Sequence, residues 1–216
     1  MKYAKATALV LAFFLCALTA CLALFFRSSG CGTDRGLVSG ERTIMSNGIE
    51  RVYYLKLPEP YDSRTPYPLL FGFHGAGGDY RAFTEGSYDL PRVVGEDAIL
   101  VYPLGLANEA GLTLWDQEND LIFFDDLYRE LEENLCFDTG MVFAVGHSAG
   151  AGFTHVLGCR RGNLLRAIAP VSGALLDHDH CVGQVAVLQI QGANDQLVPL
   201  GLIRPTRDYW IAINGC

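Results

Sequence analysis

The stretch from Val142 to Gly152, VFAVGHSAGAG, constrains the fold of this chain more than any other part of its sequence. An apolar run typical of a buried strand leads into Gly146-His147-Ser148-Ala149-Gly150, and small residues follow where a helix would begin. The strand and the helix pack closely around a G-x-S-x-G turn, so the residues two positions from the serine must be small. The pattern predicts a strand, a sharp turn and a helix, with the Ser148 hydroxyl exposed above a sheet.

Apolar strands alternate with helical runs along the rest of the chain. Asn47-Gly48 is a strong signal for a two-residue hairpin turn, and it lies between two strand-like runs. Further strands are expected at 67–73 (YPLLFGF), 98–103 (AILVYP), 141–145, 165–173 and 184–192. Helices are expected at 121–135 and 149–159. A last helix is expected to begin near Pro205, which would lie in its first turn. This order predicts an α/β fold of the α/β-hydrolase type, a mostly parallel sheet with helices on both faces. We expect a single domain over residues 31–216, which begins with a polar tether at 31–40.

The N-terminal segment, residues 1–30, has the pattern of a targeting sequence. Lys2 and Lys5 precede an uncharged apolar stretch that runs from Ala6 to Phe26. This pattern favours a signal peptide or a membrane anchor. The motif LTAC resembles a lipobox, in which case Cys21 would become a lipidated N-terminus. An uncut membrane span and cleavage near Ser29 are the alternatives, and all three place the domain outside the cytoplasm.

Charge and cysteine content exclude several kinds of partner. The net charge is −8 and no basic stripe is found, so we expect no nucleic-acid partner. Five cysteines follow the targeting segment, Cys31, Cys136, Cys159, Cys181 and Cys216, without the spacing of a zinc site. In an oxidising compartment they indicate disulfides, with one cysteine left over. We expect neither a metal nor a cofactor.

Ser148 is the candidate nucleophile, and two further segments would serve it. A serine needs a base to take its proton, and backbone N–H groups to stabilise an oxyanion. Ala149, at the start of the helix, is expected to supply one N–H group. The loop HGAGGDY after the strand at 67–73 would supply another from Ala76, with Gly75 or Gly77 as alternatives, while His74 orients the loop. A plain turn is the other interpretation; a phosphate loop is excluded because no Gly-Lys-Ser/Thr follows.

Asp195, in QGANDQLVP after the strand at 184–192, is the candidate acid that would orient a histidine. A helix cap or a surface turn is the alternative role for this aspartate. Trp115 is a weaker candidate for the wall of a substrate pocket, because an aromatic residue in such a position is often part of the core. Asp125 and Asp126 are interpreted as charges on a helix surface.

Taken together, the motifs FGFHGAGGDY, GHSAGAGFTHVLGCRRG, LRAIAPVSGAL, QGANDQLVP and RDYWIAINGC resemble the secreted feruloyl esterase and polyhydroxyalkanoate (PHB) depolymerase-like family of α/β-hydrolases. The resemblance covers Arg42 to Cys216. It implies a serine carboxylic ester hydrolase that works through an acyl-enzyme on an aromatic-acid carbohydrate ester or a short hydroxyacid polyester. It also implies the roles given above to Ser148, Asp195, Ala76 and Ala149. Family disulfides would include Cys136, Cys159, Cys181 and Cys216, with the pairs unassigned.

The chain departs from this family in its histidines. The family's catalytic histidine follows the W-x-x-x-N-G-C stretch, and this sequence ends at Cys216. His74 and His147 belong to the two turns, and His155 is expected to point into the core. His178 and His180 precede Asp195, which would break the usual order of the triad. We therefore expect the base to lie beyond Cys216 in a longer chain, with an inactive or purely binding protein as the alternative. Peptidase activity shares the same serine turn.

Overall fold

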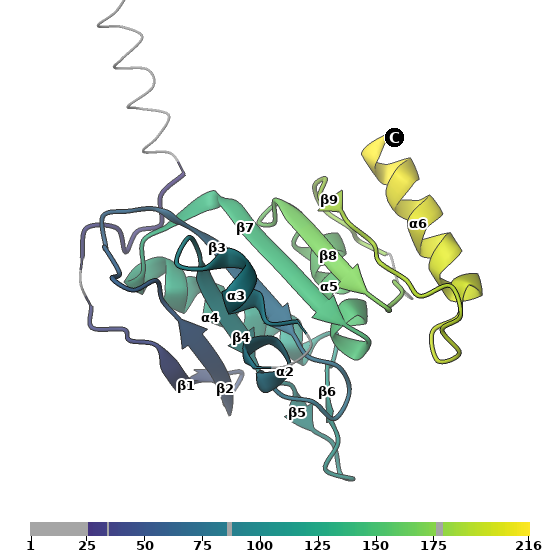
Figure 1. The fold of residues 1–216 in the computed structure, drawn as a ribbon, viewed down its shortest axis with the longest axis horizontal. Coiled ribbons are helices and arrows are strands. Elements are labelled where there is room, and N and C mark those ends of the chain that lie inside the picture. The colour runs from purple at the N-terminus through teal and green to yellow at the C-terminus, as the bar shows by residue number, and fades with distance from the viewer. Residues whose placement is uncertain (1–25, 34, 86–87, 176–178) are drawn as a thin grey trace, which may run out of the picture.

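A seven-stranded sheet runs through the protein in the order β1-β2-β4-β3-β7-β8-β9 (Figure 1). The computed structural model describes residues 26–33, 35–85, 88–175 and 179–216. The strands are β1 (Gly40–Ser46), β2 (Ile49–Lys56), β3 (Tyr67–Phe73), β4 (Ile99–Pro103), β7 (Phe137–His147), β8 (Ala167–Val171) and β9 (Ala186–Val187). The pairs β1–β2 and β2–β4 are antiparallel, and the pairs from β4 to β9 are parallel. The predicted α/β class is confirmed.

Helices cover both faces of the sheet, with α2 and α3 on the near face in Figure 1 and α4 and α5 on the far face. The helices are α2 (Arg81–Thr84), α3 (Leu90–Val94), α4 (Asn119–Asn134), α5 (Ala149–Arg160) and α6 (Leu200–Asn214). The core includes the Phe71 and Phe124 rings, whose centroids are 5.0 Å apart across the interface of β3 with α4. Within the described ranges, every helix is too short or too polar to cross a bilayer.

The predicted hairpin at Asn47-Gly48 is confirmed. Asn47 has φ of 48° and Gly48 has φ of 76°, and β1 pairs with β2 on either side of them. Positive φ at both central residues is the requirement of a type I′ turn, which Asn-Gly meets at little cost. This turn therefore fixes the register of the two outer strands.

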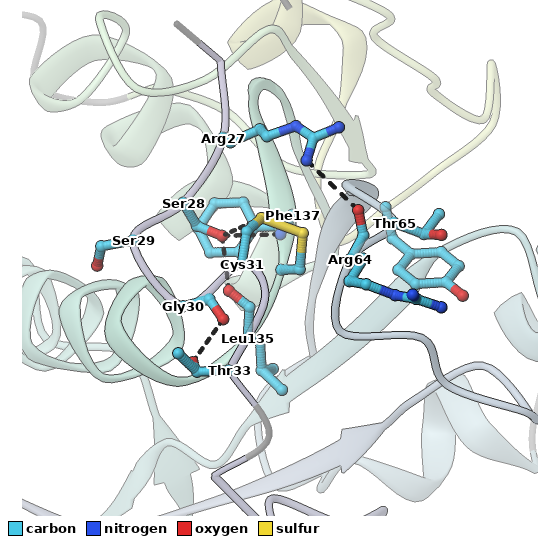
Figure 2. The surroundings of a disulfide bond; sticks show 12 residues. Arg27, Ser28, Ser29, Gly30, Cys31, Thr33, Arg64, Thr65, Leu135 and Phe137 are labelled. Carbon is cyan, nitrogen blue, oxygen red and sulfur yellow. Dashed lines mark hydrogen bonds between the residues drawn. A yellow bond between two sulfur atoms is a disulfide. The ribbon is translucent and has the colours of Figure 1, made fainter. Parts of the chain in front are cut away.

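The segment before the first strand is part of the fold, as Figure 2 shows. A disulfide joins Cys31 to Cys136, 105 residues apart. The buried Ser28 hydroxyl donates to the Leu135 carbonyl at 2.6 Å and accepts from the Phe137 N–H at 2.8 Å. The expectation that residues 31–40 form a free tether is therefore wrong at its start. Ordered packing reaches back across the expected 30/31 boundary, while Cys21 and residues 1–25 lie outside the described residues.

The second disulfide joins Cys159, at the end of α5, to Cys181. Cys216 carries a free and exposed thiol. Disulfide formation by Cys136, Cys159 and Cys181 is confirmed. Cys216 is therefore the cysteine left over that the odd count predicts, and its place in a family disulfide stays a prediction.

Two predictions near the C-terminus are also corrected. The run at 184–192 is not a continuous buried strand: β9 comprises only Ala186–Val187, Ile190 adds an isolated parallel bridge to Val171 of β8, and Leu188 and Ile190 are 63% and 48% exposed. Among the described residues, β9 is the last strand of the sheet, so one of its edges has no strand beside it. α6 begins at Leu200, so Pro205 lies inside the helix rather than in its first turn. A short hairpin of β5 (Leu106–Ala107) and β6 (Thr113–Leu114) was not predicted, because two-residue strands carry no readable period.

Candidate active site

Ser148 occupies the sharp turn that the sequence predicts. β7 ends at His147 and α5 begins at Ala149, and Ser148 between them has φ of 54° and ψ of −118°. A Cβ on Gly146 would collide with the Gly150 carbonyl, and one on Gly150 would collide with the Phe73 carbonyl. Both glycines are therefore required by close backbone approach. Strained dihedrals of this kind on a non-glycine residue are concentrated at functional sites.

A cavity of about 330 Å³ lies beside Ser148. Its walls are mainly apolar and include Trp115, Phe153, Val156 and Leu202, with Gln117 as a polar member. A second cleft, of about 470 Å³, is lined by residues such as Leu70, Phe143 and Ala169 of the sheet and contains neither Ser148 nor Asp195. The smaller cavity is therefore the one that can present a ligand to the serine.

The loop after β3 packs against Ser148. A Cβ built on Gly75 would stand 3.4 Å from the Cβ of Ser148. The N–H of Gly77 donates to the Thr113 carbonyl at 2.8 Å, and the N–H of Gly78 donates to the Gly75 carbonyl at 3.0 Å. These bonds remove Gly77 from the three possible oxyanion donors. Ala76 stays a prediction, and so does Ala149, whose N–H lies in the first turn of α5 where N–H groups lack helical acceptors.

The His74 side chain contacts the loop after β3 and the segment after β4. Its ring is buried, with Nδ1 2.7 Å from the Gly75 carbonyl and Nε2 3.0 Å from the N–H of Gly105. Because Nε2 accepts a hydrogen bond from the Gly105 N–H, the neutral ring carries its own proton on Nδ1, and Nδ1–H donates a hydrogen bond to the Gly75 carbonyl. Burial lowers the pKa of His74. The Gly75 carbonyl and the charges of Asp79 and Asp120 oppose this shift, because they favour the protonated ring. The neutral ring is thus the form that fits the site.

Trp115 packs against the core and also lines the cavity beside Ser148, while its role in a substrate pocket stays a prediction. Its ring stacks on Phe153 at 5.2 Å between centroids and meets Phe73 edge-on at 5.2 Å. Its indole Nε1–H donates to the His74 carbonyl at 2.8 Å. The side chain therefore lines the cavity and restrains the neighbouring loop at the same time.

Asp195 is held by several donors in the loop before α6. Oδ1 accepts from the N–H groups of Leu197 and Val198, each at 2.9 Å, and Oδ2 accepts from Gln191 Nε2 at 3.1 Å. The Val198 N–H, followed by the Leu197 N–H and the side chains of Ser172 and Gln191, lowers the pKa of the Asp195 carboxyl, although burial opposes them. Val198 also lines the cavity beside Ser148. The loop that carries Asp195 therefore reaches the cavity at Val198, and the lowered pKa keeps the Asp195 carboxyl ionised at neutral pH.

The described histidines have other partners. His155 is buried as predicted, and its Nδ1 accepts from Trp210 Nε1 at 2.9 Å. The His147 ring lies 5.3 Å from that of Tyr88, His180 is exposed, and His178 lies outside the described residues. In the part of the chain that the structure describes, no hydrogen bond joins a histidine to Ser148 or Asp195. The same part contains no cluster of His, Cys, Asp and Glu that could hold a metal.

Sequence reasoning missed the residues that support the loop from a distance, Arg51, Gly105 and Asp120, and also Gln191 beside Asp195. A glycine directly after β4, in the sequence YPLG, was a readable signal for Gly105. The buried pair of Arg51 and Asp120 gave none, because its members are 69 residues apart.

Curated proteins with similar sequences are feruloyl esterases. Feruloyl esterase D of Neurospora crassa is 35% identical, over 88% of this chain and 69% of that protein. The chain belongs to the feruloyl esterase family. Feruloyl esterase C of Emericella nidulans, also 35% identical, is matched over 88% of this chain and 70% of its own length. No protein-family model matches the chain. The predicted membership in a family of carboxylic ester hydrolases is confirmed, while the likeness to polyhydroxyalkanoate depolymerases stays a prediction.

Solved structures with the same fold include other esterases. A thermostable esterase superposes with a TM-score of 0.66 at 17% identity, over 82% of this chain; this chain spans about half of it, 52%. A ferulic acid esterase of Anaeromyces mucronatus, solved with ferulic acid, gives a TM-score of 0.62 at 18% identity, over 86% of this chain and 84% of its own. At these identities the likeness shows the α/β-hydrolase fold.

Proposed function

We propose that the protein hydrolyses esters of aromatic acids through an acyl-enzyme on Ser148. The observation that carries this proposal is the position of Ser148 on a strained turn between the Gly75 loop and a cavity walled by Trp115 and Phe153. Flat aromatic walls suit a planar aromatic acyl group, because stacked and edge-on ring contacts add to apolar burial. Family membership supports the same substrate class, since the relatives are feruloyl esterases.

In the proposed reaction, Ser148 Oγ attacks the carbonyl carbon of the ester and its proton passes to a base. The carbonyl oxygen becomes an oxyanion that accepts from the N–H groups of Ala76 and Ala149. The C–O bond then breaks, the alcohol leaves with a proton, and the acyl group stays on Ser148. Water repeats the attack and releases the acid. The ionised Asp195 carboxylate is the group that would orient the base and stabilise its cationic form.

The two disulfides support a site of action outside the cytoplasm, where oxidised cysteines persist. Residues 1–25 would supply export, either as a signal peptide or as an anchor lipidated at Cys21.

Cleavage near Ser29 would remove Ser28 and its two buried hydrogen bonds. We therefore propose processing before Phe26. The mass of the exported protein tests this, and a mature chain that begins after Ser28 would contradict it.

The test of function is turnover of methyl ferulate and p-nitrophenyl acetate by the protein, by Ser148→Ala and by Ser29→Ala, which changes an exposed serine. When the assay uses a chain that carries the triad histidine, we expect turnover in the first and third proteins and loss of it in Ser148→Ala. A different outcome would be tight ferulate binding with no turnover by the folded protein. That result would overturn the proposal and favour a binding protein of the same fold.

A further inference from the structure

A series of buried and part-buried hydrogen bonds leads from Arg51 to the loop at Ser148. Arg51 Nη2 donates to the Leu104 carbonyl at 3.2 Å. That carbonyl shares a peptide group with the Gly105 N–H, which donates to His74 Nε2 at 3.0 Å. On the other side of the ring, His74 Nδ1 donates to the Gly75 carbonyl at 2.7 Å. Groups from three separate segments, at Arg51, Leu104–Gly105 and His74–Gly75, thus form one continuous series.

The last bond of the series sets the direction of an N–H group. The Gly75 carbonyl and the Ala76 N–H belong to one planar trans peptide, so they point in opposite directions. Fixing the carbonyl toward the His74 ring therefore turns the Ala76 N–H away from the ring. In a series of this kind each bond polarises the next, which makes the last N–H a stronger donor.

Arg51 also fixes the second support of the loop. It pairs with Asp120 Oδ1, and Asp120 Oδ2 accepts from the Asp116 N–H at 2.5 Å. Asp116 follows Trp115, whose indole donates to the His74 carbonyl. Both side chains of the ion pair are almost fully buried, with 2% and 1% of their surfaces exposed. One guanidinium therefore braces both segments that hold His74.

We propose that Arg51 and His74 are positioning residues for ester hydrolysis, and that they act by aiming the Ala76 N–H at the oxyanion. This inference rests on the proposed function and adds to it residues that do not contact the substrate. The close packing of Gly105 supports it, because a Cβ there would collide with the Leu114 carbonyl and stand 3.3 Å from Cε1 of His74. The peptide that contacts the ring has no room to shift.

The first test is the kcat and KM for methyl ferulate of His74→Phe and of Arg51→Met/Asp120→Asn. The double variant removes the buried charge pair together, and the Asn carbonyl can still accept the Asp116 N–H. Arg161→Met is the matched control. Arg161 forms an ion pair with Asp125, with 2.5 Å between Nη2 and Oδ2, and this pair lies away from the loop. We expect kcat to fall roughly tenfold or more in the first two variants with KM within about twofold, because an oxyanion donor acts on the transition state. Equal losses in the control, or an unchanged kcat in folded His74→Phe, would overturn the proposal.

The second test does not need turnover, so it separates this inference from a failure of the proposed function. Imidazole ¹⁵N spectra of the labelled protein, with His74→Phe for assignment, report which ring nitrogen carries the proton. The proposal requires a neutral His74 with its proton on Nδ1, and faster exchange of the Ala76 amide proton in the double variant. A proton on Nε2, or an Ala76 amide unaffected by loss of Arg51, would overturn it.

Discussion

Gly75 stands between two side chains of the serine turn: a Cβ built on it would lie 3.2 Å from His147 Nδ1 and 3.4 Å from the Cβ of Ser148. Contacts this short leave a methyl group little room. The loop and the turn are therefore packed to the limit that glycine allows, and small displacements of either should affect the chemistry.

Gly75→Ala should lower kcat/KM for methyl ferulate by roughly 10- to 100-fold, because misplacement by about 1 Å near a reacting group costs rate on that scale. The midpoint of thermal unfolding should change little, since the added methyl meets side chains that can move by tenths of an ångström. Gly201→Ala is the matched control, because a Cβ there meets open space on α6. A Gly75→Ala enzyme with wild-type kcat/KM would show that the loop does not act on the serine.

Trp115→Phe should separate the two contacts of the Trp115 side chain. Phe keeps an aromatic wall but loses the N–H that donates to His74, so kcat should fall while ferulate binding is largely retained. Trp115→Leu should, in addition, weaken ferulate binding relative to acetate ester hydrolysis, because the ring contact is lost. Steady-state kinetics and quenching of Trp210 fluorescence by ferulate would measure both effects.

Trp210→Phe is the matched control. Like Trp115, Trp210 donates its indole N–H to an acceptor on a histidine, here Nδ1 of His155, but this bond lies in the core. The Trp210→Phe substitution should lower the free energy of unfolding by about 1–3 kcal/mol, as expected when a buried acceptor loses its donor, and leave kcat unchanged. Equal kinetic defects in the two Phe variants would contradict the role assigned to Trp115.

Stability should depend on pH through His155. Burial lowers the pKa of His155 to about 4, although the Gly173 carbonyl favours the protonated form. In the unfolded chain, His155 binds a proton more readily than in the folded protein. The contribution of neutral His155 to stability is therefore complete above about pH 6.5 and is lost as the pH falls toward 4. The loss is on the order of 3 kcal/mol, from about 1.36 kcal/mol per pKa unit.

Urea unfolding of the protein and of His155→Leu between pH 4 and pH 7 would measure this contribution. The variant should show a shallower fall in the free energy of unfolding at acid pH. It should not be flat, because the pKa of the buried His74 is also lowered and titrates in the same direction. Identical slopes for the two proteins would contradict the assignment to His155.

Loss of the Cys31–Cys136 disulfide should lower the free energy of unfolding by about 2–4 kcal/mol, because the bond closes a long loop in the unfolded chain. Chemical unfolding of Cys31→Ser/Cys136→Ser under non-reducing conditions measures the loss. Cys216→Ser should have no effect, since that thiol is free and exposed. Equal stability of the double variant and the wild type would mean that Phe26–Thr33 does not brace the fold.

The sequence predicted the features that depend on neighbouring residues. The Asn47-Gly48 turn and the Ser148 turn follow from local backbone requirements, and both have the expected dihedral angles. The extent of β9 was predicted wrongly, because an apolar run does not reveal that its strand lies at an edge of the sheet. The Arg51–Asp120 pair could not be predicted, since only tertiary packing brings β2 and the start of α4 together.

The proposed mechanism requires a covalent intermediate at Ser148. Acid-quenched samples taken during methyl ferulate hydrolysis, digested and analysed by mass spectrometry, should contain a feruloyl group on the peptide with Ser148. The group should be absent from Ser148→Ala, together with turnover. Hydrolysis that persists in Ser148→Ala, or an adduct only on another residue, would contradict the account.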